Sequence, residues 1–318
     1  MDLLFPKMRY DHTMPLLDGR IEIPGVTLKP VATPAMVWED QPDLRTGDFG
    51  LCDLNGGYWL SAIEAGWELI GLPLFIKRKS LYQYLFVRND AGIEVPGDLA
   101  GKRIGTASYP TGITIQLAGL LQGRHGVDVS SFRWVVNRKG AVFPLHVETH
   151  IEHPDGPSKA PWDRLLDGEV DAIMTDISDG AAWERLEGDP GVRRLFDYQA
   201  EDKKLYDETG VYPVMHLIVM SKTLDREHPD LARKLYDGFE AAKTRAYEDI
   251  LNDRAGFSVV YLRERLVEQT AAWGDPWVYG VAANRNLIDR FIEYNAAQGI
   301  TSRKLGDEEI FAAGTLET

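Results

Sequence analysis

One histidine interrupts an otherwise apolar run in the second half of the chain. His216 is the one titratable side chain between Val214 and Met220. In a β-strand alternate side chains share a face, so His216 would lie beside Val214 and Ile218. Burial disfavours a protonated imidazole and a bound carboxylate favours it, so this residue could donate a proton when an acidic ligand is present. The alternative is a buried neutral histidine that is hydrogen-bonded to the backbone.

A second group of polar residues follows the first expected strand. Tyr10, Asp11 and His12 come directly after the segment "LLFPKM". In open α/β sheets ligands bind beyond the carboxyl ends of the strands. Asp11, together with His12, could accept the proton of a phenol or catechol. The alternative is an Asx-turn or a helix cap.

A third group marks the start of an expected helix at residues 105–114. Free N–H groups at a helix N-terminus bind anions. Ordinary capping by Thr111 is the alternative, and both can hold at once. No "GKT" or "GKS" follows, so the pattern is weaker than a phosphate-binding loop. The candidates here are Thr106, Ser108, Tyr109, Thr111 and Thr114.

Two further turns could line a cleft, and each could equally be a simple strand-to-helix turn. The glycines in the first turn would permit close backbone approach. Tyr212, in the same segment as His216, is one more ligand-binding candidate. The turn residues are Asp53, Asn55, Gly56 and Gly57 in the first turn, and Thr175, Asp176 and Ser178 in the second.

A basic cluster, Lys77, Arg78 and Lys79, follows a buried strand. A guanidinium can hold a carboxylate by two parallel hydrogen bonds, so Arg78 is the favoured member. A solvated loop is the alternative. We therefore name His216, Asp11 and Arg78 as candidate catalytic residues.

A metal site is a weaker candidate. His146, Glu148 and His150 alternate, so a strand would place them on one face, with His153 close behind. Imidazole and carboxylate groups suit Zn²⁺, Mn²⁺ or Fe²⁺. The spacing differs from the helical H-E-x-x-H, and a polar edge strand is the favoured interpretation.

Composition restricts the partners. The chain has 318 residues and a net charge of −14, which argues against nucleic acid and anionic membranes as partners. Cys52 is the only cysteine, so an internal disulfide and a Cys-based zinc site are excluded. We see no signal peptide or membrane span, so we expect a cytoplasmic protein. Homo-oligomerisation is left open.

Alternating strand and helix patterns predict an α/β protein of two lobes with a central cleft. The expected helices include one that ends at Gly126 and an amphipathic one at His228–Leu251, where apolar residues recur at three- and four-residue steps. The first lobe would use residues 1–90 and 205–318, and the second residues 98–200. Two crossing segments, 90–98 and 200–205, would join the lobes. Clefts between lobes are common ligand sites.

Three segments carry a resemblance to a known family. "YDHTMPLLDG" (Tyr10–Gly19) resembles the opening motif of the 4,5-dihydroxyphthalate decarboxylase family. Asp98–Val127 and Tyr206–Leu224, with its "YPVMH", resemble two later motifs of the family. The family's arginine-rich stretch is replaced here by "LPLFIKRKSLYQY" (Leu72–Tyr84).

The family is similar to type II periplasmic solute-binding proteins and to their pyrimidine-synthase relatives. The resemblance therefore implies that fold, and decarboxylation of a small anionic aromatic acid without a cofactor. Two alternatives stay open: a solute-binding or sensory protein for an aromatic or heterocyclic acid, and a metal-assisted enzyme that uses the His146 group. The central expectation is that Asp11, Thr111 and His216 share one hollow.

Overall fold

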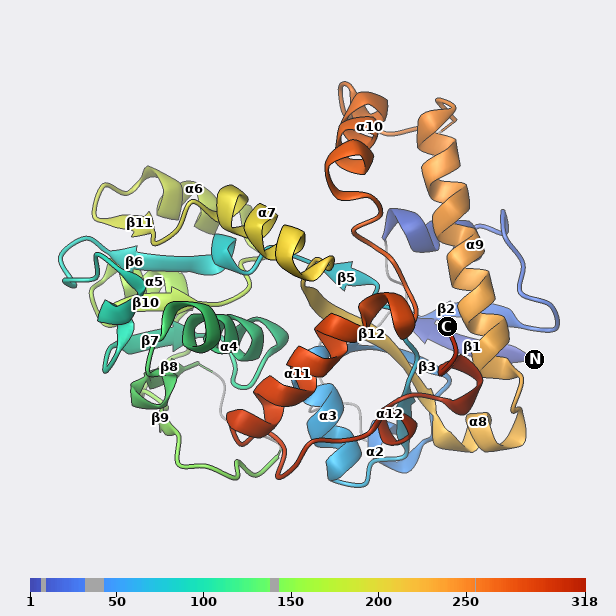
Figure 1. Cartoon of the computed structure of the whole chain (residues 1–318), viewed down its shortest axis with the longest axis horizontal. Helices are drawn as coiled ribbons and strands as arrows, with labels where there is room; N and C mark the ends of the chain where they lie inside the picture. The colour runs from blue at the N-terminus through green and yellow to red at the C-terminus, as the bar shows by residue number, and fades with distance from the viewer. Residues whose placement is uncertain (7–9, 32–42, 138–142, 255) are drawn as a thin grey trace.

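The computed structural model describes all residues except 7–9, 32–42, 138–142 and 255. The described residues form two α/β lobes that lie side by side (Figure 1). The first lobe holds a four-stranded sheet and a separate two-stranded sheet of β1 and β2, and the second lobe holds a six-stranded sheet. No helix in the described ranges is both long enough and apolar enough to span a bilayer.

The first lobe is built around β12, an eight-residue strand that is buried along its whole length. β12 pairs antiparallel with β3 on one side and with β4 and β5 on the other. A strand with neighbours on both sides and covered faces needs a continuous apolar run, which is the pattern around His216. The strands of this lobe are β1 (Asp2–Pro6), β2 (Thr27–Val31), β3 (Leu51–Asn55), β4 (Leu69–Gly71), β5 (Lys77–Arg78) and β12 (Val214–Ser221). Its helices are α1 (Met14–Leu17), α2 (Asp43–Thr46), α3 (Gly56–Glu64), α8 (Lys222–Glu227), α9 (Leu231–Leu251), α10 (Leu262–Trp273), α11 (Arg285–Ala297) and α12 (Asp307–Ile310).

The second lobe holds a six-stranded sheet in the order β11-β6-β10-β7-β8-β9. Its bounds are β6 (Leu85–Arg88), β7 (Arg103–Thr106), β8 (Arg133–Val136), β9 (His150–Glu152), β10 (Ala172–Met174) and β11 (Val192–Arg194). The helices α4 (Gly112–His125), α5 (Pro161–Leu166), α6 (Gly180–Gly188) and α7 (Tyr198–Thr209) flank it. Short 3-10 turns occur at η1 (Asp11–Thr13), η3 (Tyr82–Tyr84), η4 (Pro96–Leu99), η5 (Val129–Ser131), η6 (Ala282–Asn284) and η7 (Ala313–Thr315).

The chain crosses between the lobes at points other than those predicted. β6 pairs with β10 and β11, so the first crossing comes before Leu85 rather than at residues 90–98. The Gly- and Pro-rich stretch that suggested a connector is a turn inside the second lobe, around η4. α7 continues to Thr209 and packs on η3, so the second crossing follows it rather than residues 200–205.

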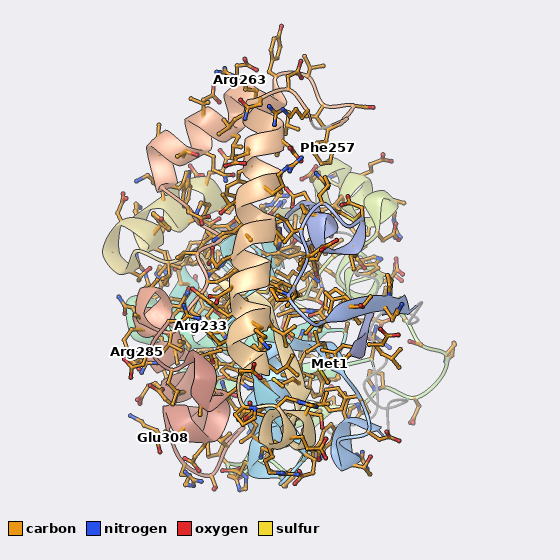
Figure 2. All side chains as sticks on the ribbon, turned by 90° about the vertical axis from the view of Figure 1, so that its right-hand side faces the viewer. Met1, Arg233, Phe257, Arg263, Arg285 and Glu308 are labelled. Carbon is orange, nitrogen blue, oxygen red and sulfur yellow. The ribbon has the colours of Figure 1, made fainter. Side chains whose placement is uncertain are left out.

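The longest helix confirms the sequence pattern. The apolar positions spaced by three and four residues in α9 are buried, from Leu231 to Ile250. Figure 2 shows α9 running vertically through the middle of the view, with Phe257 in the loop beyond its C-terminal end. α4 also ends as predicted, at Gly126 with φ 65°, a left-handed conformation that glycine adopts readily.

Candidate active site

His216 and Asp53 form a buried couple on the sheet of the first lobe. His216 lies opposite Asn55 in the β12–β3 ladder, so Asp53, two residues earlier on β3, shares its face. The Nδ1 of His216 lies 2.7 Å from Asp53 Oδ1, and His216 is 1% exposed. Because a carboxylate only accepts, Nδ1 carries the proton and Nε2 is left for other chemistry. The histidine is therefore oriented by a carboxylate and not by the backbone.

Two lysines of the first lobe contact a carboxylate of the second lobe. Lys77 is the cross-strand partner of His216, and its Nζ lies 3.3 Å from Asp176 Oδ2 in the second lobe. Lys79 Nζ lies 2.5 Å from Asp176 Oδ1. Burial opposes ionisation of Asp176, but the two ammonium groups outweigh it and lower its pKa. The three residues form one charged contact between the lobes.

A second histidine–carboxylate couple lies at η1. Asp11 Oδ1 accepts from the backbone N of His12 at 2.9 Å and lies 3.0 Å from its Nδ1. Burial opposes ionisation of Asp11, but the bonds from His12 prevail and lower its pKa. His12 is 4% exposed, and its Nε2 has no hydrogen-bond partner among the described residues. The imidazole, not the half-exposed carboxylate, is thus the group with unused bonding capacity.

The ring of Tyr10 connects these groups. It stacks on His12 at a centroid distance of 5.5 Å. Burial, and then the negative charges of Asp53 and Asp176, raise the pKa of Tyr10. The Tyr10 hydroxyl therefore lies within electrostatic reach of both carboxylates and stays protonated.

A cavity of about 370 Å³ brings several of these residues together, in the size range of small-molecule sites. The helical wall of the cavity, which α9 and α10 form, was not predicted. These helices are distant in sequence from the polar motifs, and their residues belong to no motif. The lining residues are Tyr10, Asp11, His12, Ile76, Lys77, Arg78, Lys79, Tyr247, Ile250, Leu262, Arg265, Leu266, Gln269 and Trp277.

Arg78, the favoured carboxylate clamp, does not have a free guanidinium. It donates to the carbonyls of Tyr212 and Val278 and to Asn284 Oδ1. Burial lowers its pKa to about 10. Arg78 lines the cavity together with Lys77 and Lys79, but three of its N–H groups already donate within the protein. Its role as a carboxylate clamp stays a prediction.

Asp11 lines the 370 Å³ cavity, whereas Thr111 and His216 are not among its lining residues, so the structure does not bring the three expected residues into one pocket. The Thr111 hydroxyl caps α4, accepting from the backbone N of Thr114 at 3.2 Å. Asn55 Oδ1 accepts from Gly57 N and, across the lobes, from Gly112 N, both at 2.9 Å. A methyl group on Gly57 would lie 2.6 Å from Thr111 main-chain atoms. The predicted anion site at this helix end is instead a tight contact between the lobes.

The other predicted ligand residues lie around the cleft without reaching the cavity. Tyr109 is buried and packs on Trp134 at 4.9 Å. Thr106 Oγ1 donates to the carbonyl of Ser108 at 3.1 Å, and Thr175 Oγ1 accepts from Ala107 N at 3.3 Å. Tyr212 packs between Trp273 and Trp277.

The proposed metal group is not assembled. Only His150–Glu152 of that segment is a strand, so the alternation that would align the three side chains is absent. His146 Nε2 lies 3.1 Å from Glu64 Oε2. In the described part of the chain no three His, Cys, Asp or Glu residues converge as metal ligands would.

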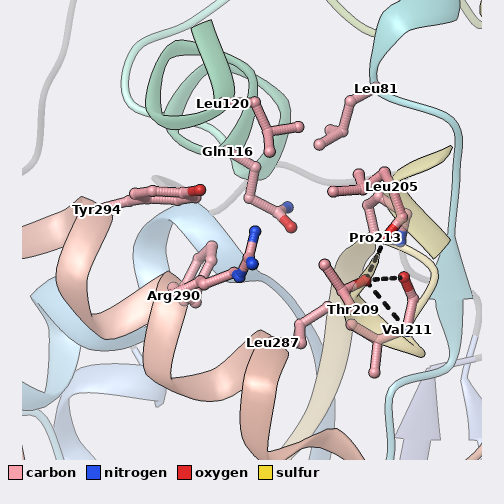
Figure 3. Close-up of a pocket in the computed structure, with 11 residues that line it drawn as sticks. Leu81, Gln116, Leu120, Leu205, Thr209, Val211, Pro213, Leu287, Arg290 and Tyr294 are labelled. Atoms are coloured by element: carbon pink, nitrogen blue, oxygen red, sulfur yellow. Dashed lines mark hydrogen bonds between the residues drawn. The ribbon is translucent and has the colours of Figure 1, made fainter. Parts of the chain in front are cut away.

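A smaller cavity of about 30 Å³ lies between the two lobes, at α4 and α11 (Figure 3). Its walls are mainly apolar, with Leu120, Leu205 and Leu287 among them. A space of this size holds about one or two waters, so it does not accommodate an aromatic ring.

Comparison with known proteins gives a consistent picture. No family model matches the chain. It is 32% identical to a 4,5-dihydroxyphthalate decarboxylase of Comamonas testosteroni, over 97% of this chain and 96% of that protein. It is 30% identical to one of Pseudomonas putida over 52% of this chain and 66% of that protein.

Solved structures confirm the predicted type II periplasmic-binding-protein fold. The aliphatic sulphonate binding protein SsuA from Escherichia coli matches with a TM-score of 0.55 and 13% identity, covering 98% of this chain and 91% of that one. SsuA from Xanthomonas axonopodis pv. citri matches with a TM-score of 0.53 and 14% identity, over 98% and 96% of the chains. At this identity the likeness concerns the fold alone.

Proposed function

Because the chain belongs to the 4,5-dihydroxyphthalate decarboxylase family, we propose that it decarboxylates a hydroxylated aromatic acid. The observation that carries the proposal is 32% identity along almost the whole length of a protein of that name. 4,5-Dihydroxyphthalate, which would give protocatechuate and CO₂, is the first substrate to test. No organic cofactor is needed for the chemistry.

The reaction exchanges a carboxylate for a proton on one ring carbon. A base takes the proton of a ring hydroxyl, and electron density moves into the ring. An acid then protonates the carbon that bears the carboxylate. The bond from that carbon to the carboxylate breaks, its electron pair restores the aromatic ring, and CO₂ leaves. The base returns its proton to the hydroxyl oxygen.

The two histidine–carboxylate couples suit these two roles. His12, held by Asp11, is one of the residues that line the cavity, and its buried Nε2 has no hydrogen-bond partner among the described residues. This nitrogen would accept the hydroxyl proton. His216, held by Asp53, lies beside Lys77 of the cavity wall. In the doubly protonated form, which a bound substrate carboxylate favours, it would supply its Nε2 proton to the ring carbon. In each couple the carboxylate fixes the ring so that Nδ1 is occupied and Nε2 is available. Opening and closing of the lobes would admit the substrate and then exclude water.

A binding protein without turnover is the second candidate. The SsuA structures with the same fold bear the names of sulphonate-binding proteins, and binding proteins also close two lobes on an anion. The two candidates differ in one observable: a decarboxylase forms a product and a binding protein does not.

The test is incubation of the purified protein with 4,5-dihydroxyphthalate in D₂O. We expect CO₂ and protocatechuate with one deuterium at the ring carbon that carried the carboxylate. His216→Gln should lower kcat by about 10² to 10⁴ while the affinity for phthalate changes little. His228→Gln, at an exposed histidine after α8, is the matched control.

Two outcomes would contradict the proposal. Saturable binding of several hydroxylated aromatic acids with no product would favour the binding protein. Full kcat in His216→Gln would remove His216 as the proton donor while leaving the decarboxylase in place.

A further inference from the structure

We propose that Lys77, Asp176 and Lys79 form the binding site for the second carboxylate of an aromatic ortho-dicarboxylate, with Asp176 as an internal stand-in for that group. This Lys–Asp–Lys cluster would give the protein its preference for dicarboxylates over monocarboxylates. The inference rests on the proposed function for the position of the ring, but it concerns binding and not turnover.

The charge of the cluster favours an anion. Two ammonium groups face one carboxylate, which leaves a local charge of +1 in a chain whose net charge is −14. The three side chains are at most 30% exposed, so solvent screens the cluster only in part. A ligand carboxylate would meet a locally positive site.

The hydrogen-bonding capacity of the lysines is not exhausted. An ammonium group has three donors. Within the described part of the chain each lysine donates one hydrogen bond, to Asp176. The donors that are left can bind a second carboxylate beside Asp176 or in its place.

The position of the cluster fits a ring that carries two neighbouring carboxylates. Lys77 and Lys79 line the 370 Å³ cavity together with Tyr10. Lys77 is also the cross-strand partner of His216, and such pairs have Cβ atoms about 5 Å apart. A spare carboxylate on the lysines would therefore place the adjacent ring carbon toward the proposed proton donor.

The cluster also links ligand binding to the lobes. Both lysines belong to the first lobe and Asp176 to the second. A ligand carboxylate that shares the ammonium groups competes with the contact that joins the lobes. Removing the carboxylate of Asp176 should then strengthen ligand binding, whereas removing a merely structural ion pair would not.

The test measures binding of phthalate and benzoate by titration calorimetry. Phthalate has no hydroxyl group, so its binding is read without turnover, and a failure of the decarboxylase proposal leaves the result interpretable. We expect the wild type to bind phthalate about 10- to 100-fold more tightly than benzoate, since one charge-assisted contact set is lost. The double variant Lys77→Gln/Lys79→Gln should lose this preference and still bind benzoate.

Two further variants sharpen the result. Asp176→Asn should bind phthalate more tightly than the wild type does, and Lys29→Gln, at an exposed lysine of β2, should leave both affinities unchanged. A preference that survives the double variant would overturn the inference. So would a wild type that does not prefer phthalate, or weaker phthalate binding in Asp176→Asn.

Discussion

Asp202 on α7 should make the stability of the fold depend on pH in a way that one substitution removes. It is 5% exposed, and its Oδ1 has no hydrogen-bond partner in the described residues. Burial raises its pKa from 3.8 to about 6; a hydrogen bond with Ser80 opposes this and Glu201 adds to it. Its partner Ser80 lies between β5 and β6, in the segment where the chain leaves the first lobe.

The magnitude follows from the two pKa values. Between 3.8 and about 6 the folded protein holds the proton more tightly than the unfolded chain does. The favourable contribution is complete below pH 3.8 and is lost as the pH rises through about 6. At 1.36 kcal/mol per pKa unit, the loss amounts to about 3 kcal/mol above pH 7. Asparagine resembles the protonated acid in shape and charge, so Asp202→Asn should escape this loss.

The assay is urea unfolding of the wild type and Asp202→Asn, followed by tryptophan fluorescence from pH 4 to pH 8. The free energy of unfolding of the variant should exceed that of the wild type by an amount that grows with pH, toward about 3 kcal/mol. Asp207→Asn on the same helix is the control, since Asp207 is exposed and paired only with Lys203 in the described residues. Its effect should stay within about 0.5 kcal/mol at every pH. Parallel pH profiles for wild type and Asp202→Asn would refute the reasoning.

Two further substitutions test the lobe contact and the buried arginine. Gly57→Ala should weaken phthalate binding by about tenfold and increase the radius of gyration in X-ray scattering, because its methyl group would meet Thr111 main-chain atoms at 2.6 Å. Gly123→Ala, where nothing lies within 4 Å, should do neither; equal scattering curves for both would contradict closed lobes. Arg78→Met should lower the free energy of unfolding by about 3 kcal/mol, since three buried acceptors lose their donor. The exposed Arg233→Met is its control, and equal urea midpoints would show that the buried bonds add nothing.

The sequence predicted those features that depend on local pattern. The spacing of apolar residues identified α9, and the unbroken apolar run identified β12. Thr111 and Gly126 marked the two ends of α4. Each of these depends on contacts within one element or with a continuous core, so a short window of sequence contains the information.

The features that were missed depend on partners far away in sequence. The lobe boundary failed because a glycine- and proline-rich turn looks the same inside a lobe as between lobes. Arg78 was preferred over Lys77 and Lys79 on the chemistry of its side chain alone. The groups that occupy the Arg78 guanidinium belong to Tyr212, Val278 and Asn284, which are far away in the sequence, so no local pattern shows them.

The free-energy cost of burying these charged and polar groups supports catalysis over simple binding. A charged pair withdrawn from water gains little for stability, and apolar residues of similar size often serve a fold equally well. The Lys–Asp–Lys cluster is enough to recognise an anion and to hold the lobes together. Anion recognition does not need two histidine–carboxylate couples, one of them with a buried imidazole nitrogen that has no partner among the described residues. Under the proposed mechanism the two couples move protons at the hydroxyl and at the carboxylate-bearing carbon, which are two tasks that a protein that only binds an anion does not have.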